Sequence, residues 1–215
     1  MSVPRAFQSI PKFLGSEFNS KLLDFVLDKE DEFKPSTVGK IGSHDPQIRV
    51  SSILSDIGSF KVVLEQRILD LVPKLITQLG LTPFTPTGVE IEAAQHVEGA
   101  FYRRHIDLFT AQDRNEKADR LISLVYYFHK IPKSFSGGVL RLYPSPGVSY
   151  RPDEPSTDVT PEQDLAIAFS SWVPHEILPV SCPTGQFGDS RFAINCWVLR
   201  ARAPVAHTKQ TEKTI

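Results

Sequence analysis

The hydrophobic period of the chain changes near residue 84, and this change constrains the fold more than any other feature of the sequence. Before that point, apolar residues recur at helical spacing in two segments. Beyond it, short segments alternate apolar with polar residues and are separated by glycine- and proline-containing turns. The pattern predicts an antiparallel sandwich or barrel of strands with helices packed beside it.

The two helical segments occupy the N-terminal third. One apolar stripe follows Ser16 and a broader one follows Ser59, and both serines are expected to cap the helix that comes after them. Gly80 is expected to end the second helix. Between the helices, residues 48–50 are the clearest candidate for a short strand.

The expected strands lie in the remaining two thirds of a single domain that spans residues 1–215. We expect residues 1–83 to give helical support and a substrate-side region, residues 84–202 to form the strand-rich core, and residues 203–215 to be a polar tail. Two segments are expected to be loops near a working edge, Thr110–Asp119 and Ser145–Asp164. The expected strands are Val89–Val97, Ala100–Leu108, Arg120–Phe128, Gly138–Tyr143, Leu165–Phe169, Ser171–Pro179 and Arg191–Arg200.

The charge balance and the cysteine count exclude several classes of function. The chain has 24 Lys and Arg against 25 Asp and Glu, so it lacks the basic excess of a nucleic-acid-binding protein. No apolar run approaches the roughly 20 residues that span a bilayer, so no membrane partner is expected. Cys182 and Cys196 are the only cysteines, which is too few for a disulfide scaffold or a four-thiolate zinc site. A reducing cytoplasm is the expected location.

A His-x-Asp sequence is the first candidate for chemistry. On a strand, His105 and Asp107 would point to the same face with their backbones about 7 Å apart, which lets both reach one cation. His175, on a later strand, is the natural third ligand. Two neutral nitrogens and one carboxylate form the facial triad of non-haem Fe(II) oxygenases. The alternative for the pair alone is a surface histidine beside a solvated aspartate.

Other functional classes lack their characteristic sequences or leave a residue unexplained. There is no Gly-x-Ser-x-Gly elbow for a serine hydrolase, and no second histidine follows His175-Glu176 at the spacing of a zinc hydrolase. A metal-free β-sandwich binding module remains an alternative. That alternative does not explain Arg191, because a guanidinium on an apolar-rich strand needs an anionic partner if it is buried.

Five sequence features occur in order between about residues 95 and 200. After His105-Ile-Asp107 come the run Arg120–Phe128, which contains a tyrosine pair, and Gly137-Gly138-Val-Leu140. His175-Glu-Ile and a basic residue six positions before Trp197 complete the series. Together these features resemble the prolyl-hydroxylase-like branch of the Fe(II)/2-oxoglutarate dioxygenases.

The resemblance implies a mainly β fold, with flanking helices and a double-stranded β-helix (jelly-roll, cupin-like) core. It implies that His105, Asp107 and His175 are the catalytic iron ligands, and that Fe(II), 2-oxoglutarate and O2 are needed, with ascorbate as a helpful reductant. Arg191 and Tyr127 match the residues that bind the distal carboxylate of 2-oxoglutarate. A guanidinium suits that role because it donates two parallel hydrogen bonds to a carboxylate.

Further positions are expected around the same site. Leu140 and Ile177 match apolar walls of the cosubstrate pocket. His96 lies near the position of a tyrosine that is common in the family, and it can donate a hydrogen bond in place of that tyrosine or line the pocket. Trp197 matches an aromatic residue on the substrate side. Arg103 is expected on the same strand face as His105 and Asp107. Arg49 and Trp172 are candidates for the entrance of the pocket. All three are expected to face the substrate.

The expected reaction is hydroxylation of an unactivated C–H bond. The substrate is expected to be a prolyl residue of a peptide or protein, or a small amino-acid-like or natural-product molecule. Halogenation or another oxidation by a related enzyme is the alternative, although halogenases usually replace the carboxylate ligand that Asp107 supplies here. The sequence leaves the substrate, the regiochemistry and the oligomeric state open.

Overall fold

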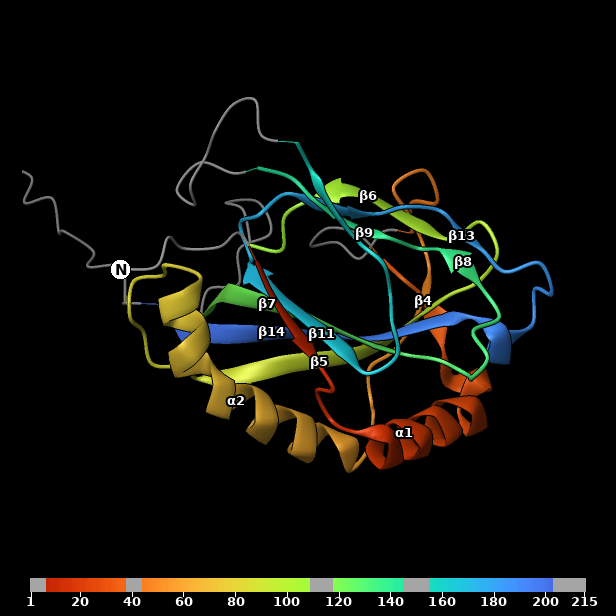
Figure 1. Ribbon diagram of the computed structural model, residues 1–215, viewed down its shortest axis with the longest axis horizontal. Helices are drawn as coiled ribbons and strands as arrows, with labels where there is room; N and C mark the ends of the chain where they lie inside the picture. Colours follow the sequence, from red (N-terminus) through yellow and green to blue (C-terminus); the bar gives the residue numbers. More distant parts are fainter. Residues whose placement is uncertain (1–6, 38–43, 109–117, 145–154, 203–215) are drawn as a thin grey trace, which may run out of the picture.

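The protein consists of two facing antiparallel sheets with two helices packed on the outer face of the larger one (Figure 1). The computed structural model describes residues 7–37, 44–108, 118–144 and 155–202. Most of the two expected loops, and the tail from residue 203, lie outside these residues. The jelly-roll core implied by the family resemblance is confirmed.

The strand order places segments from both ends of the chain in the larger sheet. Its seven strands are, in order, β1 (Phe7–Pro11), β11 (Leu165–Ser170), β7 (Ala118–Phe128), β14 (Arg191–Ala201), β5 (Gly88–His96), β4 (Ser52–Leu54) and β2 (Lys34–Pro35). The smaller sheet contains β10 (Thr157–Val159), β9 (Leu140–Leu142), β12 (His175–Ile177), β6 (Phe101–His105) and β3 (Arg49–Val50). A two-stranded sheet pairs β13 (Val180–Ser181) with β8 (Ser136–Gly137). Two short 3-10 turns occupy Glu30–Glu32 and Phe187–Asp189.

Both expected helices are present, as α1 (Ser16–Asp28) and α2 (Phe60–Gln78). The buried residues of α2 lie three or four positions apart, so they form one face that packs on the sheet: Leu64, Ile68, Val72 and Leu75. Gly80 follows the end of α2 with φ +66°, as expected of a helix-ending glycine. Ser59 is the N-cap residue of α2 as expected, although its side chain makes no capping hydrogen bond, whereas the expectation for Ser16 is wrong because Gly15 is the N-cap residue of α1.

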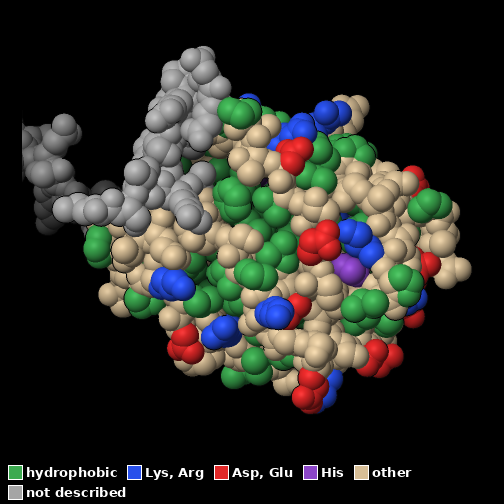
Figure 2. All heavy atoms as spheres, viewed as in Figure 1, with side chains coloured by type: hydrophobic (Ala, Val, Ile, Leu, Met, Phe, Trp, Pro, Cys, Tyr) green, Lys and Arg blue, Asp and Glu red, His purple; other side chains and the backbone are tan. Residues whose placement is uncertain are grey.

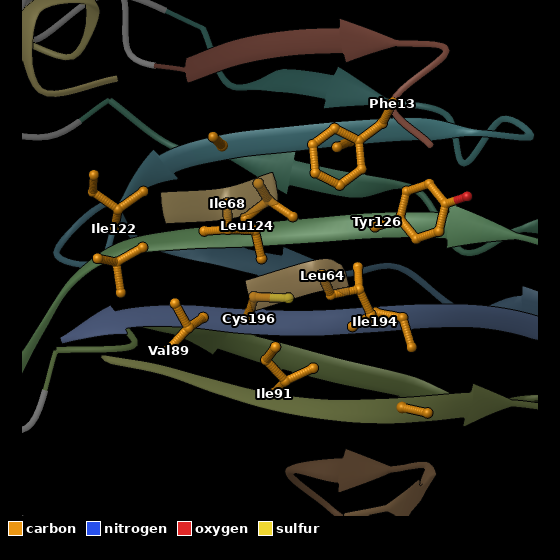
Figure 3. Packing of buried hydrophobic residues seen from close by; sticks show 14 of the residues in the cluster. Phe13, Leu64, Ile68, Val89, Ile91, Ile122, Leu124, Tyr126, Ile194 and Cys196 are labelled. Carbon is orange, nitrogen blue, oxygen red and sulfur yellow. The ribbon is translucent and has the colours of Figure 1, made fainter. Parts of the chain in front are cut away.

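Alternation along the long central strands divides the apolar residues into two layers. On β7 and β14, one set of side chains faces the helices and joins the main core, as Figure 3 shows for Leu124, Tyr126, Ile194 and Cys196 beside Leu64. The intervening residues of the same strands face the smaller sheet. Burying each large apolar side chain contributes about 1.5–3 kcal/mol, so the helix-side layer holds the sheet rigid while its other face remains free to line a site.

The strand predictions hold best where the segments are long. The seven expected strands all contain a strand, but the segment Ser171–Pro179 is a strand only over β12. Residues 171–174 form a turn before it, and β13 begins only at Val180. Pro174 and Pro179 lack the backbone N–H that a continuous ladder requires. Sequence reasoning also missed β1, whose five residues pair with β11 at the edge of the larger sheet.

The described surface mixes both signs of charge. On the face in Figure 2, Lys and Arg side chains are interspersed with Asp and Glu, in keeping with the formal net charge of -1. Among the described residues, no helix combines the length and the apolarity needed to cross a membrane.

Candidate functional site

Three potential metal ligands meet at one end of the smaller sheet. His105, the last residue of β6, is paired in register with His175, the first residue of β12. Asp107 lies two residues beyond β6, where its backbone N–H donates to the carbonyl of Ser171 at 2.9 Å. The ligand atoms of the three residues all lie within 4.8 Å of one another. The structure therefore brings together the three side chains that the sequence predicted as one site.

The surroundings of both imidazoles leave a free nitrogen on each. Nδ1 of His105 lies 2.8 Å from the carbonyl oxygen of Arg103, and Nδ1 of His175 lies 2.9 Å from that of Val173. Because a carbonyl oxygen only accepts, Nδ1 is the donor in both rings, and Nε2 is the nitrogen that each ring presents to Asp107. The two Nε2 atoms lie 3.6 Å and 3.5 Å from the oxygens of Asp107.

The protonation states also suit a divalent cation. Burial lowers the pKa of His175 to about 4 despite the nearby carboxylate, so this imidazole is neutral at neutral pH. Burial alone would raise the pKa of Asp107, but His175, His105 and the Ser123 hydroxyl together hold it far below its usual range. The donor set is therefore one neutral imidazole, one ionised carboxylate and the imidazole of His105, and two imidazoles with one carboxylate are the set that non-haem Fe(II) sites use.

A buried guanidinium lies in the same pocket. Arg191, at the start of β14, has no exposed surface; its Nε donates to the carbonyl of Gly138 at 2.9 Å and its Nη1 lies 3.3 Å from Nδ1 of His96. By distance and angle neither its Nη2 nor the hydroxyl of Tyr127 is satisfied among the described residues, and the two groups are neighbours that shift each other's pKa, with the Tyr127 ring 5.0 Å from the guanidinium carbon. Buried donors without a partner are costly. Their convergence fits an anionic group that would accept from both.

Two consecutive glycines make room for that guanidinium. Gly138 has φ +61°, and a Cβ there would lie 2.5 Å from Cδ of Arg191 and 2.9 Å from Cγ2 of Val180. Gly137 has φ +68°, and a Cβ there would collide with the carbonyl oxygen of Pro179. Only glycine tolerates both the backbone conformation and the close approach. The Gly-Gly pair in the sequence was a signal for a tight site, although neither residue was predicted to have a role in it.

One cavity connects the ligand cluster to the guanidinium. It holds about 460 Å³ of empty space, counting the part open to solvent. Its lining includes the three candidate ligands and Arg191, the expected apolar walls Leu140 and Ile177, and the expected substrate-side residues Arg49 and Trp197. His96 and Tyr127 contact Arg191 from outside this lining.

Sequence reasoning missed several residues of the pocket. Tyr102 lines it and stacks on the imidazole of His105, with ring centroids 3.5 Å apart, and the guanidinium of Arg49 lies 4.8 Å from the centre of the Tyr102 ring. Ser123 and Asn195 line it from β7 and β14. Asn195 could have been found from the alternation along β14, because it is four positions after Arg191 and shares its face of the strand. Ser123 could have been found as a polar residue inside an apolar run.

The structure places two of the expected substrate-side residues outside the cavity lining. Arg103 is exposed, lies outside the cavity lining and donates from Nε to the carbonyl of Gln47. The register shifts between His175 and Ile177, so that residues 103 and 104 of β6 lie opposite the single residue 176 of β12, and this bulge gives the inward position to Tyr102 instead. Trp172 is in the turn before β12, where alternation does not apply, and it packs against the helix-side core.

Comparisons with known proteins agree with this geometry. A family model described as the 2OG-Fe(II) oxygenase superfamily matches residues 91–199. An uncharacterised PKHD-type hydroxylase of Synechocystis sp. is 33% identical over 205 residues, which are 92% of this chain and 64% of that protein. This chain thus spans just under two thirds of the length of that relative.

Two solved structures share the fold over nearly the whole chain. A Pseudomonas putida prolyl-4-hydroxylase is 24% identical, with a TM-score of 0.63 and coverage of 92% of this chain and 94% of that one. A prolyl hydroxylase from Trichoplax adhaerens, in complex with a peptide fragment of the hypoxia inducible factor oxygen degradation domain, is 23% identical. Its TM-score is 0.65, with coverage of 91% and 84%.

Proposed function

The chain belongs to the 2OG-Fe(II) oxygenase superfamily, and from that premise we propose that it hydroxylates an unactivated C–H bond with Fe(II), 2-oxoglutarate and O2 as cofactor and cosubstrates. One observation supports this proposal above the others. Arg191, whose Nη2 meets no acceptor among the described residues, lines the same cavity as the three converging metal ligands, and Tyr127 packs against its guanidinium from behind that lining. A metal-free binding module would have no use for both features together.

The roles of the residues follow from the chemistry of their side chains. His105, Asp107 and His175 would hold the ferrous ion, and Arg191 and Tyr127 would bind the distal carboxylate of 2-oxoglutarate, with His96 supporting Arg191. When bound, the ion and 2-oxoglutarate together activate O2 for hydroxylation, and ascorbate would keep the ion reduced. Leu140 and Ile177 line the cavity with apolar surface and exclude water from the cosubstrate.

The substrate that we propose is a prolyl residue of a peptide, with a small amino-acid-like or natural-product molecule as the second class. The names of the similar proteins support the first class, since prolyl hydroxylases recur among them. Arg49 and Trp197 are the side chains that we propose to contact the substrate, because both line the cavity. Arg49 donates from Nε to Ser51 at 2.8 Å and its Nη2 lies 3.6 Å from Oε1 of Glu92, so a substrate carbonyl or carboxylate would share this guanidinium with Glu92.

The whole chain is proposed to act as one catalytic domain in the cytoplasm. Cys182 and Cys196 are both buried and free, which supports a reducing compartment.

The decisive experiment is anaerobic reconstitution. The purified protein should bind one Fe(II) per chain and then, with 2-oxoglutarate, air and proline-containing peptides, release succinate and add 16 Da to one peptide. The variants His105→Ala and His175→Ala should lose both metal retention and turnover, because each removes one of three ligands. Full activity in either variant would refute the ligand assignment. Ser190→Ala is the control for loss of a buried polar group, because it removes a hydroxyl that accepts a hydrogen bond from Gln95 and is not one of the proposed ligands.

A further inference from the structure

We propose that Ser123 is a positioning residue for the carboxylate ligand, and that it presents Asp107 to the metal through a single oxygen. Ser123 is on β7 in the larger sheet, whereas Asp107 follows β6 in the smaller one, so their contact connects the two sheets at the site. The side chain of Ser123 is buried, and its Oγ lies 2.7 Å from Oδ2 of Asp107. This inference rests on the proposed metal centre and deepens it.

The direction of the hydrogen bonds follows from the charge of the carboxylate. An ionised Asp107 only accepts, so the hydroxyl of Ser123 must donate to Oδ2. Ser123 Oγ is also 3.0 Å from Oγ of Ser171. Because the single proton of Ser123 is already engaged, Ser171 donates in that pair. The two hydroxyls form a chain that ends on the carboxylate, and each bond in such a chain strengthens the next.

The backbone restrains the same carboxylate from a second direction. The carbonyl of Ser171 accepts from the N–H groups of both Asp107 and Leu108, each at 2.9 Å. Ser171 is the first residue of the turn that leads to His175, so its position is tied to that ligand as well. Asp107 is thus fixed by a side chain from β7 and by the backbone between β11 and β12.

The consequence concerns how many oxygens Asp107 can offer to a cation. Oδ2 accepts from the hydroxyl of Ser123 and lies 3.5 Å from Nε2 of His175, whereas Oδ1 lies 3.6 Å from Nε2 of His105 and accepts no hydrogen bond from the described part of the chain. A carboxylate held in this way would bind the ion through Oδ1 alone. Positions on the ion then stay available for the cosubstrates. Without the hydroxyl, Asp107 could turn and bind through both oxygens.

The position of Ser123 in the sequence agrees with a specific role. Between Leu121 and Phe128 it is the one polar residue apart from the tyrosine pair, and its hydroxyl contacts a candidate ligand. A buried hydroxyl in a strand interior needs a partner. A merely structural hydroxyl would bridge β7 to β11 through Ser171, and it would not affect the metal.

The test measures metal binding without turnover. Wild type, Ser123→Ala and Ser170→Ala are titrated anaerobically with Co(II), and the visible absorption spectrum is recorded, since its intensity reports the coordination number. Ser170 is the matched control, because it is equally buried, lies on β11, and its hydroxyl has no partner among the described residues. Ser123→Ala should bind Co(II) about 10- to 100-fold more weakly and show a changed spectrum, while Ser170→Ala should match wild type.

Three outcomes would overturn the proposal. The first is a Ser123→Ala protein with wild-type affinity and spectrum, which would leave the metal centre standing but remove Ser123 from it. The second is an equal loss of affinity in Ser170→Ala, which would show that the effect is structural. The third is a wild-type protein that binds no Co(II), which would refute the proposed function itself. Thermal denaturation of the metal-free proteins is recorded alongside, and Ser123→Ala is expected to stay folded.

Discussion

Replacing Arg191 by methionine tests the most unusual feature of the pocket, a cation that is completely buried and only partly satisfied. Methionine keeps an unbranched, flexible side chain but removes the charge and all five N–H donors. Removing one partner of a buried ion pair costs about 3–5 kcal/mol. At about 1.4 kcal/mol per tenfold, the affinity for 2-oxoglutarate should fall by roughly two to three and a half powers of ten.

The assay is thermal denaturation of the Co(II)-loaded protein in the absence of O2, with and without 2-oxoglutarate. At a concentration of 100 times its Kd, 2-oxoglutarate should stabilise the wild type by about 2.7 kcal/mol. For a protein of this size that is a rise in Tm of about 5–10 °C. At the same concentration, the Arg191→Met protein should gain at most about 0.4 kcal/mol, because the ratio of concentration to Kd falls to one or less.

The metal-free protein gives an independent result. Without a bound anion, burial of the guanidinium of Arg191 is offset, among the residues that the structure describes, by hydrogen bonds to the carbonyl of Gly138 and the imidazole of His96. The metal-free Arg191→Met protein should therefore be at least as stable as wild type. A large loss of stability in the metal-free variant, or an undiminished Tm shift with 2-oxoglutarate, would refute the assignment of Arg191 as the anion-binding group.

The remaining predictions concern the glycine beside Arg191 and the pH dependence of stability. Gly138→Ala should destabilise the protein by about 1–3 kcal/mol and weaken 2-oxoglutarate binding, because the new Cβ meets Cδ of Arg191. Gly185→Ala is the control for backbone strain alone, because Gly185 has φ +63° and a Cβ there would meet no atom within 4 Å. Both variants are measured by urea denaturation and by 2-oxoglutarate binding, and equal effects of the two substitutions would contradict the packing argument. Burial, with the charges of Arg191 and Arg49, holds the pKa of His96 well below 6.5, so the unfolded chain takes up a proton there that the folded protein does not. The contribution of His96 to the free energy of unfolding is complete above about pH 6.5 and falls as the pH drops below it, by at most about 1.4 kcal/mol per pH unit. His96→Gln should flatten this dependence in urea denaturation between pH 7 and pH 5, and an unchanged slope would be evidence against a neutral His96.

Local sequence patterns were sufficient for the parts of the fold that depend on periodicity. The apolar stripe of α2 and the alternation along β7 and β14 predicted both the elements and the faces that they bury, because burial of an amphipathic element depends on spacing along one segment. The identities of His105, Asp107, His175 and Arg191 as one cluster came from the order of their motifs.

Contacts between distant segments determined the rest. The bulge that turns Arg103 outward and Tyr102 inward arises from the pairing of β6 with β12, which no local period reveals. The same holds for Ser123, whose role depends on a residue from the opposite sheet. The sequence alone therefore determined which side chains could bind a metal and an anion. Only the tertiary structure decided which hydroxyl holds the carboxylate and which donors are left without a partner, because hydrogen-bond satisfaction depends on distances between strands rather than on spacing within them.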